Sequence, residues 1–216
     1  MSEKSENRLV QKDRLLEAIL PHVAFDGWTD AALESGAGVL GVNKSDVDRF
    51  FSGGVGEIVG HFSNWADREM LATLAAKDLG EMKLRERVSL AVRVRMSALF
   101  PYRETVRRTF FYLSLPGNFS IGARSIYKTV DSIWYAVGDR SADFSFYTKR
   151  ALLAGVISAT ILFWIYDESE GSADSWAFLD RRIADVMKIP TLRHRLDKLA
   201  CRVPNPFKVL RTLHAR

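Results

Sequence analysis

The residues whose types and spacing most suggest chemistry are an acid, two aromatics and a base near the start of a long apolar segment. Asp143, Phe146, Tyr147 and Arg150 recur at i, i+3, i+4 and i+7, which places them on one face of a helix. Mixed aromatic and charged faces are typical of recognition surfaces, so this face is a candidate for binding another protein. The alternative on spacing alone is an amphipathic helix start whose aromatics fold into the core.

Patterns typical of catalysis or metal binding are missing from the sequence. Glu57 and His61 lie four residues apart, but no second such pair completes a metal site. The one cysteine, Cys201, has no evident histidine partner, and a single cysteine allows no internal disulfide. We therefore expect no catalytic residue, no metal and no cofactor.

The elements that would position these residues are predicted to be helices. No segment shows sustained apolar alternation between turn signals, so strands are not expected and the fold class is all-α. The apolar run from Ala151 to Tyr166 is shorter than the roughly 20 residues of a membrane span, so it is expected to be a buried helix. We expect helices at 9–25, 29–39, 44–51, 54–78, 83–99, 103–115, 119–138, 143–167, 172–187, 191–202 and 206–215.

Three short helices followed by longer, more apolar ones resemble the helix-turn-helix head and ligand domain of TetR-type transcription regulators. The charge of the head argues against DNA binding. Between Asp26 and His61 there are two bases and six acids, a net charge of −4, and Asp46 and Asp48 lie on the helix that would enter the major groove. Because DNA binders need Lys and Arg against phosphates, we expect a degenerate head without specific DNA binding.

The C-terminal segment carries the positive charge of the chain. Residues 188–216 hold eight bases and one acid, so the first 187 residues have a net charge of −2 out of the total of +5. Residues 204–216 are expected to form a short basic amphipathic helix that lies in a membrane surface. The alternatives are a solvated terminus or a helix docked on a dimer partner. The membrane contacts would come from Phe207, Lys208, Leu210, Arg211 and Leu213.

Four segments resemble a known family. They are residues 22–28 (HVAFDGW), 129–134 (TVDSIW), 138–155 (GDRSADFSFYTKRALLAG) and 176–187 (WAFLDRRIADVM). They are similar to the accessory lipid-binding protein family of ubiquinone biosynthesis, the ninth coenzyme Q protein, in its alphaproteobacterial form. Ala142, Ser145 and Phe146 depart from the family's usual Ser-Thr-Asp-x-Asn-Trp-Tyr pattern, which changes small polar groups and one ring on the expected recognition face.

The resemblance implies a TetR-like helical fold that has lost DNA binding, with a hydrophobic ligand pocket and a C-terminal membrane helix. It also implies a surface patch that engages the hydroxylase of the same pathway. Carried over by position, that patch includes Asp143, Phe146, Tyr147 and Arg150. The resemblance places Arg150 near lipid headgroups as well, so this arginine is expected to serve two roles.

The ligand implied by the resemblance is an isoprenoid quinone intermediate or a phospholipid. Residues 9–60 would form the head, residues 61–203 the lipid-binding and dimerisation domain, and residues 1–8 a disordered tail. Each candidate for the pocket lining has ordinary core packing as its alternative. Besides Arg150, the candidates are Phe110, Phe111, Leu113, Trp134, Leu152, Val156 and Leu162, with Leu115 and Ile133 beside them.

A non-enzymatic lipid-binding accessory protein is therefore the favoured function. A ligand-responsive TetR-type regulator is the alternative, and an enzyme in its own right is disfavoured by the missing catalytic patterns. A homodimer through the helices at 143–167 and 172–187 is expected, because Ala151, Gly155 and Ala159 form a strip of small residues that permits close helix approach. The alternative is that this strip packs against a neighbouring helix of the same subunit. The polar first eight residues lack the apolar core of a signal peptide. We expect a bacterial cytoplasmic protein, peripheral on the inner face of the cytoplasmic membrane.

Overall fold

The computed structural model describes the backbone of residues 3–138 and 145–200, and the side chains of residues 6–138 and 147–186. Within these ranges the chain is helical and contains no strand, as the sequence predicts. The α-helices are α1 (Glu3–Asp26), α2 (Asp30–Val39), α3 (Lys44–Phe50), α4 (Gly54–Ala75), α5 (Leu84–Leu99), α6 (Arg103–Ser114), α7 (Phe119–Ala136), α8 (Ser145–Ile165) and α9 (Ala173–Ala200). Short 3-10 turns, η1 (Phe100–Tyr102), η2 (Pro116–Asn118) and η3 (Glu170–Ser172), connect some of them.

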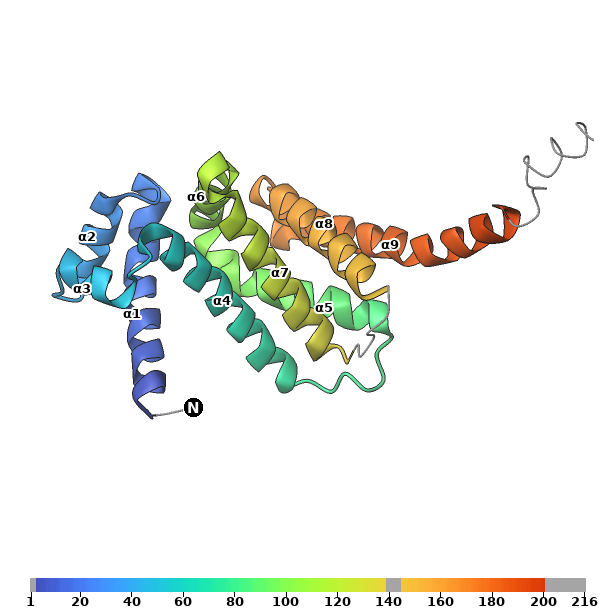
Figure 1. Ribbon diagram of the computed structural model, residues 1–216, viewed down its shortest axis with the longest axis horizontal. Coiled ribbons are helices and arrows are strands. Elements are labelled where there is room, and N and C mark those ends of the chain that lie inside the picture. Colours follow the sequence, from blue (N-terminus) through green and yellow to red (C-terminus); the bar gives the residue numbers. More distant parts are fainter. Residues whose placement is uncertain (1–2, 139–144, 201–216) are drawn as a thin grey trace, which may run out of the picture.

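The helices α1 to α3 form a head, and α4 leads from it into a body formed by α5 to α9 (Figure 1). Local capping explains the short helices of the head. Thr29 caps α2 through the amide of Ala32, and Asn43 forms a reciprocal capping box with Asp46 at the start of α3. Gly36 permits the close packing of α2 on α1, because a Cβ at this position would lie 2.6 Å from the Ile19 Cα.

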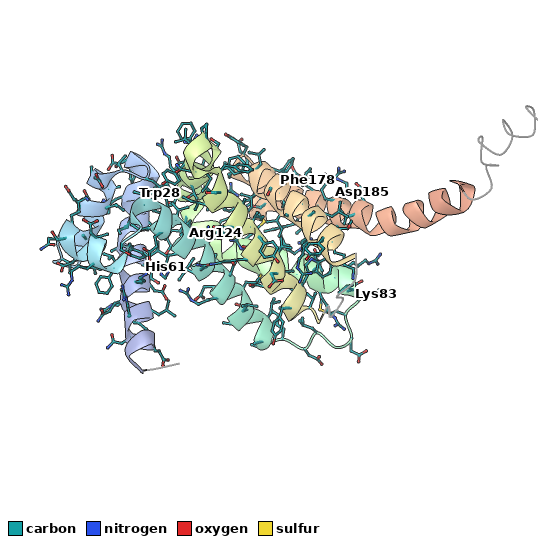
Figure 2. All side chains as sticks on the ribbon, viewed as in Figure 1. Trp28, His61, Lys83, Arg124, Phe178 and Asp185 are labelled. Atoms are coloured by element: carbon teal, nitrogen blue, oxygen red, sulfur yellow. The ribbon has the colours of Figure 1, made fainter. Side chains whose placement is uncertain are left out.

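Several polar contacts join the head to the body, and two of them involve Trp28 and His61, which are labelled in Figure 2. The Trp28 indole donates a hydrogen bond to Thr109 Oγ1 of α6 at 2.9 Å. The buried His61 of α4 lies 2.7 Å from Asp13 Oδ1 of α1. Burial lowers the His61 pKa, although the Asp13 carboxylate acts in the opposite direction. Because the pKa of His61 is lower in the folded chain than in the unfolded one, the contribution of His61 to stability is lost as the pH falls below the usual histidine pKa.

The turn between α8 and α9 is held by one buried carboxylate. Asp167 accepts hydrogen bonds from the backbone amides of Ser169 and Ser175, both at 2.9 Å, and from both serine hydroxyls. Burial opposes ionisation of Asp167, but these hydrogen bonds outweigh it and hold the pKa well below its usual range. Arg103 of α6 donates to the Asp167 carbonyl at 2.7 Å and covers the buried Trp164 ring at 4.7 Å.

Two helices run further than predicted. Helix α1 begins at Glu3, so it covers most of the segment expected to be a disordered tail. The Arg8 guanidinium contacts the Arg49 carbonyl of α3 at 3.3 Å, which ties this first part of α1 to the head. Helix α9 continues from Ala173 to Ala200, where two helices separated near Pro190 were expected. Proline removes one backbone donor, but its fixed φ is compatible with a helix, and Pro21 likewise lies inside α1.

Helix α8 is long and apolar. Residues Tyr147–Ile165 have a mean hydropathy of 1.4, enough by length and composition to cross a membrane, and 39% of this window is buried inside the structure. Leu153, Ile157 and Trp164 pack in the core with α7 and α9. The prediction of a buried helix therefore holds for one face of α8, whereas Leu162, Phe163 and the following Tyr166 are exposed.

Candidate functional site

A cavity of about 640 Å³ lies between α4, α5, α6, α7 and α8. Its walls are largely apolar, and they include two small residues of α7, Gly122 and Ala123. Its volume lies within the range of roughly 300–1,000 Å³ typical of small-molecule sites. The apolar lining consists of Val59, Phe62, Leu99, Val106, Phe110, Leu113, Phe119, Ile126 and Ile161.

One part of the lining is polar and contains a buried charge pair. Arg95 Nε donates to Asp67 Oδ1 at 2.6 Å, and Arg95 Nη2 donates to the Ser63 hydroxyl at 3.0 Å. The Thr129 hydroxyl donates to the same Asp67 carboxylate at 2.9 and 3.0 Å. Ser63, Arg95 and Thr129 line the cavity. Asp67, which is not part of the lining, holds Arg95 and Thr129, and Arg95 in turn holds Ser63. The cavity therefore combines an apolar volume with a small set of fixed polar groups.

The lining is exposed mainly near the turn between α6 and α7, which we call the mouth of the cavity, and Ser158 of α8 is a further exposed lining residue. Phe110 and Phe119 line the cavity and are also exposed to solvent, Phe119 with 71% of its surface. Ser114 and Ala123, likewise exposed, line the cavity between them. An apolar ligand would enter past these aromatic side chains.

The structure brings only part of the predicted lining to this cavity. Phe110 and Leu113 line it. Trp134, Val156 and Ile133 are buried and do not line the cavity. These three residues are therefore part of the ordinary core, which was the alternative to a pocket lining. Phe111, Leu115 and Leu162 are exposed outside the lining, and Leu152 is half-buried.

The four residues of the predicted recognition face differ in their surroundings. Tyr147 is exposed on α8, with 71% of its surface accessible. Arg150 is buried, and its Nη2 donates to Asp131 of α7 at 2.7 Å. It lies outside the cavity lining. Asp143 and the side chain of Phe146 lie outside the described residues.

The other predicted surfaces are described in part. Ala151, Gly155 and Ala159 are exposed together on α8, as an intersubunit strip would require. On α3, the Lys44 ammonium forms ion pairs with two acids of the head, Asp30 at 3.4 Å and Asp48 at 3.6 Å. The expected membrane-contact residues 204–216 lie outside the described residues. Among the described residues, no group of three or more His, Cys, Asp or Glu side chains is placed to hold a metal ion.

Sequence reasoning missed most of the cavity. Phe62 and Ser63 of α4, Arg95 of α5 and Phe119 of α7 all line it, and none was among the candidates. One signal was available: small residues cluster on α7 at Gly122, Ala123 and Ser125, between large apolar ones. Small side chains on a helix that faces the core leave space unless a neighbour fills it.

The comparisons with known proteins confirm the family resemblance. Residues 119–190, which cover α7, α8 and most of α9, match the COQ9 family model. The chain is 33% identical over 193 residues to the mitochondrial ubiquinone biosynthesis protein COQ9 of Bos taurus, covering 86% of this chain and 60% of that protein. It is 34% identical over 183 residues to the COQ9 of Rattus norvegicus, covering 82% and 58%. Both relatives are named as ubiquinone biosynthesis proteins.

A solved structure confirms the fold. The TetR transcriptional regulator from Nitrosomonas europaea ATCC 19718 superposes with a TM-score of 0.68, covering 82% of this chain and 98% of that one. The sequence identity is 20%, so the likeness concerns the fold alone. The chain spans about three fifths of the length of the two mammalian relatives.

Proposed function

We propose that the protein is a non-enzymatic lipid-binding accessory protein of ubiquinone biosynthesis. In this proposal the cavity between α4 and α8 holds the isoprenoid tail of a quinone intermediate. The observation that carries the proposal is a largely apolar cavity of about 640 Å³ in a chain that matches the COQ9 family. The names of the relatives indicate the pathway, and the apolar lining indicates that the ligand is largely apolar.

The free energy of transfer explains why such a ligand needs a carrier. Each CH₂ group moved from an apolar medium into water costs about 0.8 kcal/mol. An isoprenoid tail of several units therefore leaves a membrane only if another apolar surface receives it. Phe62, Leu113 and Ile126 offer such a surface inside the cavity.

The polar groups of the lining support an amphipathic ligand rather than a plain hydrocarbon. The Ser63 and Thr129 hydroxyls and the Arg95 guanidinium are held by Asp67 or by each other. A quinone or phenol head, or a phospholipid ester, can exchange hydrogen bonds with such groups. These contacts would fix which end of the ligand lies inward.

The first turns of α8 would present the bound intermediate to a hydroxylase of the pathway. The exposed Tyr147 offers the kind of aromatic anchor that often dominates an interface. The ion pair between Arg150 and Asp131 fixes this end of α8 on α7, so the patch would be held on a rigid support. The residue pattern also supports a homodimer through α8 and α9.

Membrane contact through residues 204–216 completes the proposal and would place the protein on the inner face of the bacterial cytoplasmic membrane. We expect no specific DNA binding, because acids occupy the head and Lys44 already contacts Asp30 and Asp48. A nanomolar, sequence-dependent gel shift at physiological salt would favour a regulator instead.

Mass spectrometry of an organic extract of the purified protein tests the proposal. The wild-type extract should contain isoprenoid quinone or phospholipid. Gly122→Phe should lose it, because a Cβ at Gly122 fits at 3.5 Å from Leu113 and the ring would occupy the cavity. Ser120→Phe is the matched control, since it adds the same ring to an exposed position of α7 outside the lining. A wild-type extract without lipid, or equal lipid in both variants, would contradict the proposal.

A further inference from the structure

The turn between α6 and α7 exposes an unusual amount of apolar surface. Phe111 at the end of α6 is 69% exposed, Leu115 before η2 is 43% exposed, and Phe119 at the start of α7 is 71% exposed. We call residues 110–119 the α6–α7 corner. It lies at the upper edge of the view in Figure 1. An exposed apolar cluster of this kind marks a binding surface more often than a solvated one.

The charges in the segments that flank the α6–α7 corner are mostly positive. From residue 107 to residue 128 the chain holds four bases, Arg107, Arg108, Arg124 and Lys128, and no acid. One acid stands just before this segment: Glu104, which contacts Arg107 at 2.7 Å and Arg108 at 3.1 Å. Residues 104–128 therefore keep four bases against one acid, a net charge of +3. Arg124 projects from the exposed side of α7 (Figure 2).

The α6–α7 corner coincides with the mouth of the cavity. Phe110 and Phe119 belong both to the exposed cluster and to the lining. A partner that binds the α6–α7 corner therefore also lies over the mouth of the cavity. An apolar ligand that leaves through this mouth meets that partner first.

We propose that the α6–α7 corner inserts into the surface of an anionic lipid bilayer, so that the mouth of the cavity opens directly toward the acyl chains. Aromatic and aliphatic side chains at a tip flanked by Arg and Lys are the composition of segments that lie in membrane interfaces. The bases meet the negative surface potential of anionic lipid. This contact is separate from residues 204–216. The route that it offers for lipid exchange rests on the proposed function, whereas the insertion itself does not.

The same charge disfavours a second copy of the chain as the occupant. In a symmetric dimer the same patch meets itself, so the net charge of +3 of residues 104–128 would oppose an equal positive charge on the second copy. An anionic bilayer offers the complementary charge and an apolar interior for Phe111 and Phe119.

Spin labels on the full-length chain test the insertion directly. Cys201→Ser removes the one native thiol, and Phe111→Cys then carries a nitroxide at the corner. Tyr135→Cys is the control, because Tyr135 is 84% exposed at the other end of α7, about 24 Å away along the helix. The vesicles consist of phosphatidylcholine and phosphatidylglycerol in equal amounts, or of phosphatidylcholine alone.

With anionic vesicles, the label at Phe111 should become more accessible to oxygen and less accessible to a water-soluble nickel complex, while the label at Tyr135 keeps its solution values. Phe111→Ser with Phe119→Ser should weaken vesicle binding by about tenfold, and Tyr135→Ser should leave it unchanged. Arg124→Glu with Lys128→Glu should weaken binding to the anionic vesicles while leaving any binding to phosphatidylcholine alone unchanged.

Two results would overturn the inference. In the first, the protein sediments with anionic vesicles while the Phe111 label remains as accessible to nickel as in solution, so another segment makes the contact. In the second, dipolar broadening between Phe111 labels appears without vesicles, so a second copy covers the corner. Neither result bears on the proposed function, which fails instead if the wild-type organic extract contains no lipid.

Discussion

Replacing Arg95 by methionine tests the polar end of the cavity. Arg95 and Asp67 form an ion pair at 2.6 Å, and each side chain has 7% of its surface exposed. Removal of one partner leaves the Asp67 carboxylate buried with only the Thr129 hydroxyl as a described side-chain donor. Breaking a buried pair in this way typically costs about 3–5 kcal/mol. In a chain of this size that corresponds to a fall in Tm of roughly 6–20 °C.

The double variant Arg95→Met with Asp67→Leu provides the matched control. It removes both charges, so the desolvation cost of an unpaired carboxylate disappears, and most of the lost stability should return. Urea unfolding at pH 7, followed by helical circular dichroism, gives the free energy of unfolding for the wild type and each variant. An ion pair exposed to solvent contributes only up to about 1 kcal/mol to stability. A cost below that value for Arg95→Met would therefore refute a buried polar end of the cavity.

Three further predictions follow from single contacts. Asp167 has a lowered pKa in the folded state, so its contribution to stability is present above pH ~4 and is lost as the pH falls below that value. The free energy of unfolding, measured in urea, should therefore fall more on acidification in the wild type than in Asp167→Asn. Gly36→Ala should destabilise the head by about 1–3 kcal/mol because of the close Ile19 backbone, whereas Gly38→Ala, with open space around it, should stabilise α2 by up to about 1 kcal/mol; equal effects on the free energy of unfolding would contradict this. Tyr147→Ala should weaken binding of the pathway hydroxylase in calorimetry by about 2 kcal/mol or more at unchanged Tm, with Tyr135→Ala, at another exposed tyrosine, as control; a large fall in Tm would show that Tyr147 belongs to the core.

The positions of the helices were predictable because local signals determine them. Gly27, Gly41 and Gly54 adopt positive φ at the breaks where the chain was expected to turn. Asn43, in the gap between the expected helices at 29–39 and 44–51, caps α3. Helix α9 shows the limit of such signals, because the break expected between residues 187 and 191 is absent from the backbone.

The cavity was less predictable, because a void depends on which helices face each other. Trp134 and Phe119 lie on the same helix and look equally suited to a pocket, yet Trp134 is buried in the core and Phe119 stands at the mouth. Asp67 and Arg95 are 28 positions apart, on α4 and α5, and each alone resembles an ordinary surface charge. Only the packing of α4 against α5 and α7 brings these two side chains together with Thr129.

Photo-crosslinking with a quinone analogue that carries a diazirine at the end of its isoprenoid tail tests the central claim most directly. If the cavity holds the tail, peptide mapping should find the crosslinks on α4, α6 and α7 at lining residues such as Phe62, Leu113 and Ile126. Gly122→Phe should abolish them, and Ser120→Phe should leave them unchanged. Crosslinks confined to the exposed face of α8, or crosslinks that persist in Gly122→Phe, would contradict a lipid-holding cavity.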